Sequence, residues 1–476
     1  MRIRTFFCVG LGAVGSCAGD SSVVPSQPIL AGVTAIANPH NALSARVALL
    51  TENVDSARIR IRGADGVEQH TPFRRLRGID TLVVLGLASE SDYTLVAEVW
   101  GGSVSLQSGA QAFRTGFLPA ALQAVHLRGV GAPSAGHTLT VPVFLGGQND
   151  GYVVAYDGSG RISWYRVIEG DGWAVEARQQ PNGNISVYVG RSYGWQATAG
   201  GYLEFRPDGE LVRRFAAAPA FYTDPHDLLL TFRDTTLESV HLIGYDIQSY
   251  PPDVTRDGRT TLAVHRILRQ SPEGQVEFEW NAGDHFSPAD WPASGVPFDL
   301  VHPSSLDIGR DGNYLVSLQA LDEVAKVNAR TGAILWRLGG RNSDFTFTGD
   351  PLGGFSGQHS VRELENGNLL MFDNRSGPDP LASRAVEYRL DQGAGTATMV
   401  WEYRPDPSIT SRIMGSAQRL RGGNTVVGFG VAGRVIEVGA GSTPIWDATL
   451  TKDGDPLPMQ FYRAVRLASL YRYERP

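Results

Sequence analysis

The chain has 476 residues and a formal net charge of -7, and its 56 glycines and 27 prolines are scattered along it. This length allows two or more domains. The modest, dispersed negative charge excludes a nucleic-acid partner, because proteins that bind nucleic acid normally have a basic face. The scattered Gly and Pro, together with the lack of a sustained helical period, indicate an all-β fold.

The first residues, MRIRTFFCVGLGAVGSC, have the pattern of an export signal. An early Arg2 precedes an apolar run from Thr5 to Val14, and small residues follow up to Cys17. The run is too short to cross a membrane as a helix. The ending VGSC resembles the cleavage box of bacterial lipoproteins. We therefore predict a lipoprotein-type signal over residues 1–17 with lipidation of Cys17, and a signal for plain secretion is the alternative.

This signal predicts a protein of the cell envelope, held at the outer membrane or in the periplasm. Ala18, not Asp, follows the lipidated cysteine, which favours the outer membrane. The only other cysteine, Cys8, lies inside the signal, so the mature chain has no pair of thiols for an internal disulfide. A polar linker with Ser and Pro is expected over residues 18–28.

Short alternating strands fill residues 29–117, such as ARVALLTE, ARIRIRG and YTLVAEVWG. Their spacing is typical of an antiparallel sandwich. The stretch TLVVLGLASESDYTLVAEVW resembles the part of fibronectin type III domains where an apolar strand, a short turn and a Tyr lead into the next strand. We expect a fibronectin type III-like sandwich that acts as a spacer or docking module.

The chain repeats itself after Leu118. A hairpin that ends in an aromatic residue recurs six times, with the aromatic at Trp164, Phe215, Trp280, Trp336, Trp401 and Trp446. A second type of hairpin lies between the copies, for example HPSSLDIGRDGNYLVSL and QHSVRELENGNLLMFD. Two hairpins per repeat make a four-stranded blade, and a ring of blades leaves few exposed edges. The prediction is a six-bladed β-propeller over residues 118–476, closed where the C-terminal QFYRAVRLASLY joins HTLTVPVFLG.

Three histidines stand where the first strand of a blade begins: His226 in DPHDL, His302 in VHPSSLD and His359 in GQHSV. In an antiparallel blade the tight Gly/Asn turns lie on one side of the ring and the long connections on the other. The starts of the innermost strands therefore face a funnel beneath the long loops, where ring scaffolds carry function. Equivalent positions in consecutive blades predict that the three imidazoles converge.

Further polar residues are expected on the same side of the ring. They are Gln319 in SLQALDEV, Asn374 and Arg375 in FDNRS, and Gln358, which precedes the third histidine. The predicted role of these four residues is substrate binding, with Arg375 as a positive charge for an anion. Asp373 is a candidate for orienting one of the imidazoles.

The segments HPSSLDIGRDGNYLVSLQALDEVAKVNARTGAILWRLGG and FSGQHSVRELENGNLLMFDNRS resemble the bacterial arylsulfotransferase family. The likeness runs from about Asp157 to Trp446. Members are six-bladed propellers that move a sulfuryl group from a phenolic sulfate ester to another phenol. The resemblance implies that the histidine of the QH motif, His359, is the transiently sulfated nucleophile. It also implies that His302 and His226 bind sulfuryl oxygens and assist proton transfer.

The chain departs from this family at Gln319, where many members carry an Arg. A neutral amide can donate a hydrogen bond to a sulfuryl oxygen but brings no charge, and the loss of a charge-assisted donor costs a few kcal/mol of transition-state stabilisation. The resemblance implies an aryl sulfate and a phenol as ligands, and the chemistry needs no cofactor.

Two other interpretations use the same residues. Three imidazoles and a water are a known catalytic zinc set, so the histidines would then serve a zinc-dependent hydrolase. Alternatively, the protein is a non-catalytic envelope lipoprotein that binds a ligand or protein through the propeller face and the sandwich, an interpretation that Gln319 favours.

Overall fold

The computed structural model of the protein describes residues 27–76, 78–143, 150–170, 172–190, 200–255, 257–292, 299–376 and 382–471. The predicted signal with Cys17 and nearly all of the predicted linker lie outside this part. Within it the chain is all-β. The helical elements are the short α1 (Ala120–Gln123) and the 3-10 turns η1 (Ala282–Asp284), η2 (Pro288–Asp290) and η3 (Gln319–Leu321). No helix among the described residues has the length and apolar character needed to cross a membrane.

The first nine strands form two sheets that pack face to face. One sheet has the order β1-β2-β6, with β1 (Ile29–Ala37), β2 (Ala45–Glu52) and β6 (Ile79–Val84). The other has the order β4-β3-β7-β8, with β5 and β9 beside β3 and β7: β3 (Ser56–Gly63), β4 (Glu68–His70), β5 (Arg74–Arg75), β7 (Asp92–Gly101), β8 (Val104–Gln107) and β9 (Gln111–Arg114). Alternate residues of β2 and β3 point into the core between the sheets, as period-2 patterning requires.

The later strands of the described chain form six further sheets. Four of them have four strands: β11 (His137–Pro142), β12 (Asp150–Tyr156) and β13 (Ile162–Glu169) with β35 (Phe461–Leu467); β14 (Trp173–Gln179), β15 (Ile185–Gly190), β16 (Gly201–Phe205) and β17 (Leu211–Phe215); β18 (Tyr222–Arg233), β19 (Thr236–Ser249), β20 (Thr261–Gln270) and β21 (Val276–Asn281); β22 (Pro303–Ile308), β23 (Tyr314–Leu318), β24 (Glu323–Val327) and β25 (Ile334–Gly339). Two have a fifth strand: β27 (His359–Glu363), β28 (Leu369–Asp373), β29 (Arg384–Asp391) and β30 (Thr396–Tyr403) with β26 (Thr346–Thr348); β31 (Ser416–Arg419), β32 (Thr425–Phe429), β33 (Arg434–Val438) and β34 (Pro444–Lys452) with β10 (Val125–Gly131).

Both predicted types of hairpin are present. The repeated aromatic residue always lies on the strand that ends a repeat, namely β13, β17, β21, β25, β30 and β34. The predicted pairing of the C-terminal segment is also confirmed, because β35 pairs with β11 in an antiparallel register. The sequence did not lead us to expect β10 on β34 or β26 on β30. Each of these short strands covers an outer sheet edge that would otherwise be open.

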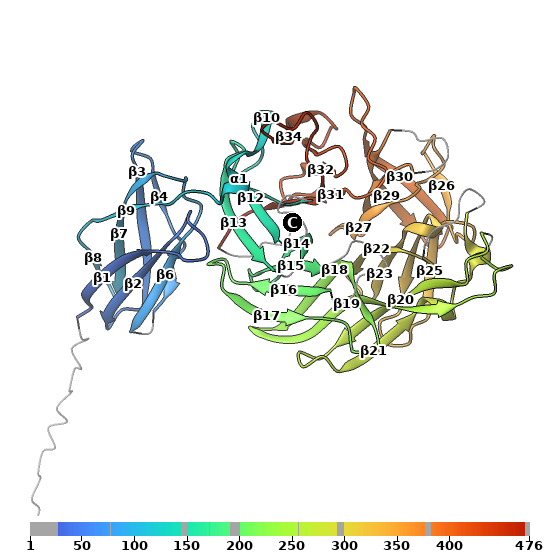
Figure 1. Cartoon of the computed structure of the whole chain (residues 1–476), viewed down its shortest axis with the longest axis horizontal. Coiled ribbons are helices and arrows are strands. Elements are labelled where there is room, and N and C mark those ends of the chain that lie inside the picture. Colours follow the sequence, from blue (N-terminus) through green and yellow to red (C-terminus); the bar gives the residue numbers. More distant parts are fainter. Residues whose placement is uncertain are drawn as a thin grey trace, which may run out of the picture.

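The first strands of the six sheets contact one another in turn. These contacts run from β14 to β18, β22, β27 and β31, then to β35 and back to β14. In Figure 1, β14, β18, β22, β27 and β31 lie toward the middle of the arrangement, whereas β17, β21 and β25 lie at its outside. Residues at the starts of different first strands are thereby brought close together.

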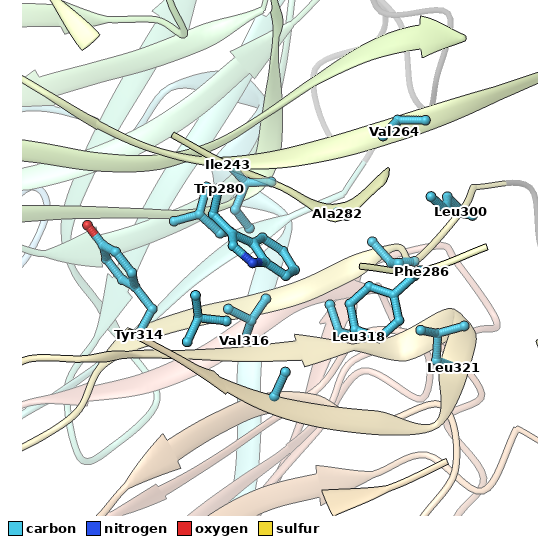
Figure 2. Packing of buried hydrophobic residues seen from close by; sticks show 14 of the residues in the cluster. Ile243, Val264, Trp280, Ala282, Phe286, Leu300, Tyr314, Val316, Leu318 and Leu321 are labelled. Carbon is cyan, nitrogen blue, oxygen red and sulfur yellow. The ribbon is translucent and has the colours of Figure 1, made fainter. Parts of the chain in front are cut away.

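Apolar side chains fill the space between neighbouring sheets. Figure 2 shows one such cluster, in which Trp280 of the β18–β21 sheet faces Val316 and Leu318 of the next sheet. Leu300 belongs to this cluster, its N–H donates to the carbonyl of Ala263 at 3.0 Å, and its carbonyl accepts the Trp291 indole at 2.9 Å. The packing therefore holds the segment that leads into His302.

The first two sheets are joined to the others by specific hydrogen bonds. Asn38 Nδ2 donates to the carbonyl of Asp208 at 2.8 Å, and Asn41 Nδ2 donates to that of Tyr165 at 3.0 Å. The Tyr471 hydroxyl accepts the Leu85 N–H at 2.8 Å. The N-terminal sheets thus contact residues from both the beginning and the end of the chain segment that forms the later sheets.

Candidate active site

Each of the three predicted histidines lies at a break in strand register. The pairing of β18 with β19 is interrupted between Thr223 and Leu228, which brackets His226. Similar breaks follow Pro303, next to His302, and follow His359 itself. Irregularities of this kind re-aim side chains and are common next to functional sites.

The register breaks bring the three imidazoles together. The ring centroids of His226 and His302 are 4.9 Å apart, and the ring of Tyr462 on β35 lies 5.7 Å from His226 and 6.4 Å from His359. The side chain of His302 is 34% exposed and that of His226 is 10% exposed. His359 is only 3% exposed. His302 therefore stands at the entrance of the cluster and His359 at its deepest point.

Two acceptors hold the ring of His359. Its Nδ1 lies 2.8 Å from Oδ1 of Asn374 and 3.0 Å from the carbonyl of Gly357. The amide nitrogen of Asn374 donates to the carbonyls of Ser411 and Met414 at 2.6 and 2.7 Å, so its oxygen must face the imidazole. With acceptors on both contacts, Nδ1 carries the hydrogen and Nε2 keeps the lone pair.

Burial keeps His359 uncharged. Removal from water, together with the neighbouring His226, lowers the pKa of His359 to about 3, and the hydrogen bonds to Asn374 and Gly357 offset only part of this effect. A neutral imidazole with a fixed tautomer is a nucleophile at any ordinary pH. The geometry therefore presents Nε2 of His359 as a nucleophilic nitrogen.

Carboxylates hold the other two histidines. Nδ1 of His226 lies 2.6 Å from Oδ1 of Asp224, and Nδ1 of His302 lies 2.6 Å from Oδ2 of Asp299. Burial lowers the pKa of His302, but the hydrogen bond and charge of Asp299 outweigh it and raise the net pKa. For His226, the effect of burial outweighs the charge and hydrogen bond of Asp224, so the net pKa is lowered. The three imidazoles therefore differ in their readiness to hold a proton, because an amide backs one and carboxylates back the others.

Several residues around the histidines have left-handed backbone angles. The φ of His302 is +45°, and Ser360, Arg375 and Met414 have φ values of +56°, +55° and +62°. Ser360 follows His359, and Met414 binds the amide of Asn374. Such angles are uncommon in non-glycine residues and cluster at sites whose geometry the surrounding structure imposes.

The four residues predicted to bind substrate differ in how close they lie to the histidine cluster. Asn374 contacts His359 directly. The amide nitrogen of Gln358 instead donates to Ser317 Oγ at 3.1 Å and to the carbonyl of Glu323 at 2.9 Å, which ties β27 to the preceding sheet. The backbone N–H of Gln319 donates to the carbonyl of His302 at 3.0 Å, so this residue borders the cluster. The guanidinium of Arg375 donates to the carbonyl of Gly354 at 3.0 Å.

The carboxylate singled out from the sequence is not the one that orients a histidine. Asp373 pairs with Arg384 at 2.9 Å and accepts the Ser356 N–H at 3.0 Å. That expectation is wrong, because the strand alternation of β28 points Asp373 away from the cluster. Asp224 and Asp299 take the role. Each stands two or three positions before its histidine, in DPH and DLVH, a local signal that sequence reasoning missed.

A network of buried charges lies next to the histidines. The fully buried carboxylate of Asp227 receives hydrogen bonds from Arg463 at 2.8 Å, Arg362 at 3.1 Å and Arg178 at 3.2 Å. These arginines come from β35, β27 and β14, so the network links first strands of different sheets. Asp227 is thus structural and does not join the imidazoles.

A cavity of 680 Å³ opens beyond this network. Its lining includes Glu176, Arg178, Arg362 and Arg463 but none of the three histidines. The arginines have carboxylate partners in Asp227 and Glu176. These three arginines are therefore already paired. Among the described residues, no group of three or more His, Cys, Asp or Glu side chains is arranged to hold a metal ion.

Comparisons with solved structures found weak likenesses. A protein of unknown function from Bacteroides caccae is 14% identical, with a TM-score of 0.44, and the match covers 70% of this chain and 100% of that one. A catalytically inactive virginiamycin B lyase from Staphylococcus aureus, solved with quinupristin, is 11% identical with a TM-score of 0.35, covering 67% and 87%. Nothing about function rests on likenesses of this strength.

Comparisons of sequence are more informative. The arylsulfate sulfotransferase AssT of Escherichia coli O6:H1 is 36% identical over 112 residues, a stretch that covers 21% of this chain and only 17% of that relative. Residues 217–451, which include all three histidines and Asn374, match the family described as Arylsulfotransferase (ASST). By this match, residues 217–451 of the chain belong to the arylsulfotransferase family.

Proposed function

We propose that the protein is an aryl-sulfate sulfotransferase that moves a sulfuryl group from an aryl sulfate ester to a phenol through a sulfohistidine at Nε2 of His359. One observation carries this proposal: an uncharged imidazole of fixed tautomer lies beside two imidazoles backed by carboxylates. This arrangement supplies a nucleophile and two proton-handling groups.

The proposal includes the setting of the site. The six later sheets are interpreted as the blades of a six-bladed β-propeller over residues 118–476, and residues 29–117 as a fibronectin type III-like sandwich. The circuit of contacts among the first strands supports the propeller. Export with a lipid anchor on Cys17 would place the enzyme in the cell envelope, at the outer membrane or in the periplasm.

In the first half-reaction, the lone pair of His359 Nε2 attacks the sulfur of the aryl sulfate. The N–S bond forms, the S–O bond to the aryl group breaks, and its electron pair goes to the leaving oxygen. Protonated His302 gives that oxygen its Nε2 proton, and a phenol leaves. The raised pKa of His302 and its exposed position suit this role.

In the second half-reaction, an acceptor phenol occupies the vacated position. Neutral His302 takes the phenol proton, the phenol oxygen attacks the sulfur, and the N–S bond breaks with return of the electron pair to Nε2. The acceptor leaves as an aryl sulfate, and the enzyme regains its starting state. Because the halves mirror each other, one residue serves as acid and then as base.

Negative charge on the sulfuryl oxygens needs donors in both halves. Gln319, whose backbone N–H donates to the carbonyl of His302, offers a neutral amide at the border of the cluster. His226, protonated when the anion binds, adds a charged donor that Asp224 supports. We assign the charge-stabilising role to His226, with Gln319 as a neutral helper, because His302 is engaged in proton transfer. The guanidinium of Arg375 already donates to the carbonyl of Gly354.

The test is acceptor-dependent release of 4-nitrophenol from 4-nitrophenyl sulfate by a form of the protein that begins after Cys17 and therefore carries no lipid. The expected result is a burst of nitrophenol equal to the enzyme concentration with donor alone, followed by steady release once a phenol is added. No release with several aryl sulfates would overturn the proposal and favour a binding function for this face.

The pH dependence of the donor half-reaction is a first prediction. Since His302 acts in its protonated form, kcat/KM should fall as pH rises through the raised pKa of His302. The low pKa of His359 leaves no acid-side loss from that residue above about pH 4. Asp299→Asn removes the carboxylate that raises the pKa, so the basic limb should move to lower pH. Asp284→Asn, beside the surface residue His285, is the matched control and should change nothing.

Asn374→Asp is a second prediction. A carboxylate in place of the amide, 2.8 Å from Nδ1, favours the charged imidazole and raises the pKa of His359. The variant should therefore lose activity on the acid side, between about pH 5 and 7, where the wild type keeps it. Asn328→Asp, in a turn where the side-chain oxygen accepts backbone N–H groups, is the control. An unaltered pH–rate profile in Asn374→Asp would contradict the assigned tautomer.

A further inference from the structure

Asp224 is shared by two histidines from different strands. Its Oδ1 accepts both the backbone N–H and Nδ1 of His226, at 2.9 and 2.6 Å. Its Oδ2 lies 3.3 Å from Nε2 of His265, which belongs to β20, the third strand of the same sheet. The carboxylate is only 3% exposed. Its two oxygens therefore serve two imidazoles and no solvent.

The ring of His265 is deeply buried and has one nitrogen without a partner. The residue is 3% exposed, and its Nδ1 makes no hydrogen bond in the described structure. Since Nε2 faces a carboxylate oxygen, that nitrogen must carry a hydrogen. A hydrogen on Nδ1 would be buried without an acceptor, which costs free energy. His265 thus points a donor at Asp224 and leaves a bare lone pair on its far side.

His265 also lies close to the other half of the site. Its ring centroid is 6.4 Å from that of His302 and 5.5 Å from that of Tyr245, the residue opposite it on β19. Its own strand holds the segment before His302, through the bridge between Ala263 and Asp299. One strand therefore supports both carboxylate-backed histidines.

We infer that His265 is a positioning residue, which acts through Asp224 to set how strongly His226 holds a proton. A donor on Oδ2 draws negative charge away from Oδ1, so the carboxylate attracts the His226 proton less strongly. It also keeps Oδ1 turned toward His226. Without that donor, the Asp224–His226 pair would retain its extra proton to higher pH, whichever member carries it.

This inference rests on the proposed function only for its meaning in catalysis. In the proposed sulfuryl transfer, His226 must gain a proton when the anionic group arrives and release it when the product leaves. A pair that holds its proton too tightly would keep the product sulfate bound. The charge on His226 itself, however, is measurable in the absence of any reaction.

The experiment uses the full exported chain with ¹⁵N-labelled histidine, and NMR titration of His226 from pH 4 to 10. His265→Phe keeps a ring against Tyr245 but removes the donor, and should raise the titration midpoint of His226 by about one pH unit. His265→Gln, whose amide can donate to Oδ2, should restore most of the wild-type midpoint. An unchanged midpoint in folded His265→Phe would overturn the inference.

His241→Phe is the matched control. His241 is buried in the same sheet and binds the hydroxyl of Tyr314 at 2.8 Å, away from Asp224. Its replacement should lower stability without moving the His226 midpoint. An equal shift of the midpoint in both variants would show that His265 acts only through packing and would refute its proposed role. If His265→Phe does not fold, the wild-type NMR spectrum still tests the inference, because it shows which nitrogen of His265 carries the hydrogen. A hydrogen found on Nδ1 of His265, instead of Nε2, would contradict the inference.

The kinetic readout separates this inference from the proposed function. If transfer is detected, its pH–rate profile should shift in His265→Phe in the direction of the NMR midpoint. If no aryl sulfate reacts but the midpoint shifts, the proposed function fails and the coupling of His265 to His226 stands.

Discussion

His359→Ala is expected to abolish sulfuryl transfer, with a loss of at least about a thousandfold in kcat. The variant lacks the imidazole that is proposed to form the covalent intermediate, so both half-reactions should fail. The burst with donor alone should vanish as well. In the wild type, intact-protein mass spectrometry after donor addition should show a mass increase of one SO3 group, and peptide mapping should place it on His359. Neither signal should remain in the variant.

The control for this loss is another buried histidine. His241→Ala removes an imidazole that is 6% exposed and bound to Tyr314, but that does not contact the three site histidines. It should lower thermal stability and leave kcat within a few-fold of the wild type. Transfer that survives in His359→Ala within tenfold of the wild type would move the nucleophile elsewhere and contradict the proposed mechanism.

Asp227→Asn is expected to cause the largest loss of stability. The wild-type carboxylate is fully buried and holds Arg463, Arg362 and Arg178, and it also accepts the backbone N–H of Leu306 at 2.9 Å. An amide of the same shape removes the counter-charge of Arg178 and Arg362 and leaves Arg463 with Glu176 alone. Breaking a buried ion pair in this way costs about 3–5 kcal/mol. The measurement is urea unfolding followed by tryptophan fluorescence, since the repeated tryptophans lie in the later sheets.

The pH dependence of stability gives this prediction a sign. The arginines hold the pKa of Asp227 well below its usual range despite the opposing effect of burial. A depressed carboxyl pKa stabilises the fold above the unfolded-state pKa, and that contribution disappears as pH falls. The wild type should therefore lose more stability on acidification than Asp227→Asn. Asp453→Asn, which breaks an exposed pair with Arg128, is the control and should lose as much stability on acidification as the wild type. An equal loss of stability in Asp227→Asn and the wild type would contradict the importance of the network.

Local patterns in the sequence were enough for the strands and hairpins. Alternation of apolar and polar residues sets which face of a strand is buried, and Gly and Asn in the turns set where it reverses. Both hairpin types, the aromatic position at Trp280 or Trp446, and the return of β35 to β11 could be predicted in this way. The positions of His226, His302 and His359 at the starts of first strands are equally local, since each one follows from its own repeat.

The partners of these side chains were not predictable from the same patterns. Register breaks and left-handed angles near His302 and His359 re-aim side chains, and a shift of one residue moves a side chain to the other face of its strand. For this reason Asp373 was a wrong choice as the orienting carboxylate. It also explains why the sequence did not reveal that Asn374, predicted to bind substrate, contacts Nδ1 of His359.

The sequence by itself determined the all-β class, the repeats, the family and the three histidines, because these depend on periodicity and on residues close together in the chain. Only the tertiary structure decided the proton chemistry. Asn374 backs one imidazole, Asp224 and Asp299 back the others, and His265 reaches Asp224 from the third strand of the sheet. Burial and charge at a point in space depend on every sheet that meets there, and no single segment of the sequence contains that information.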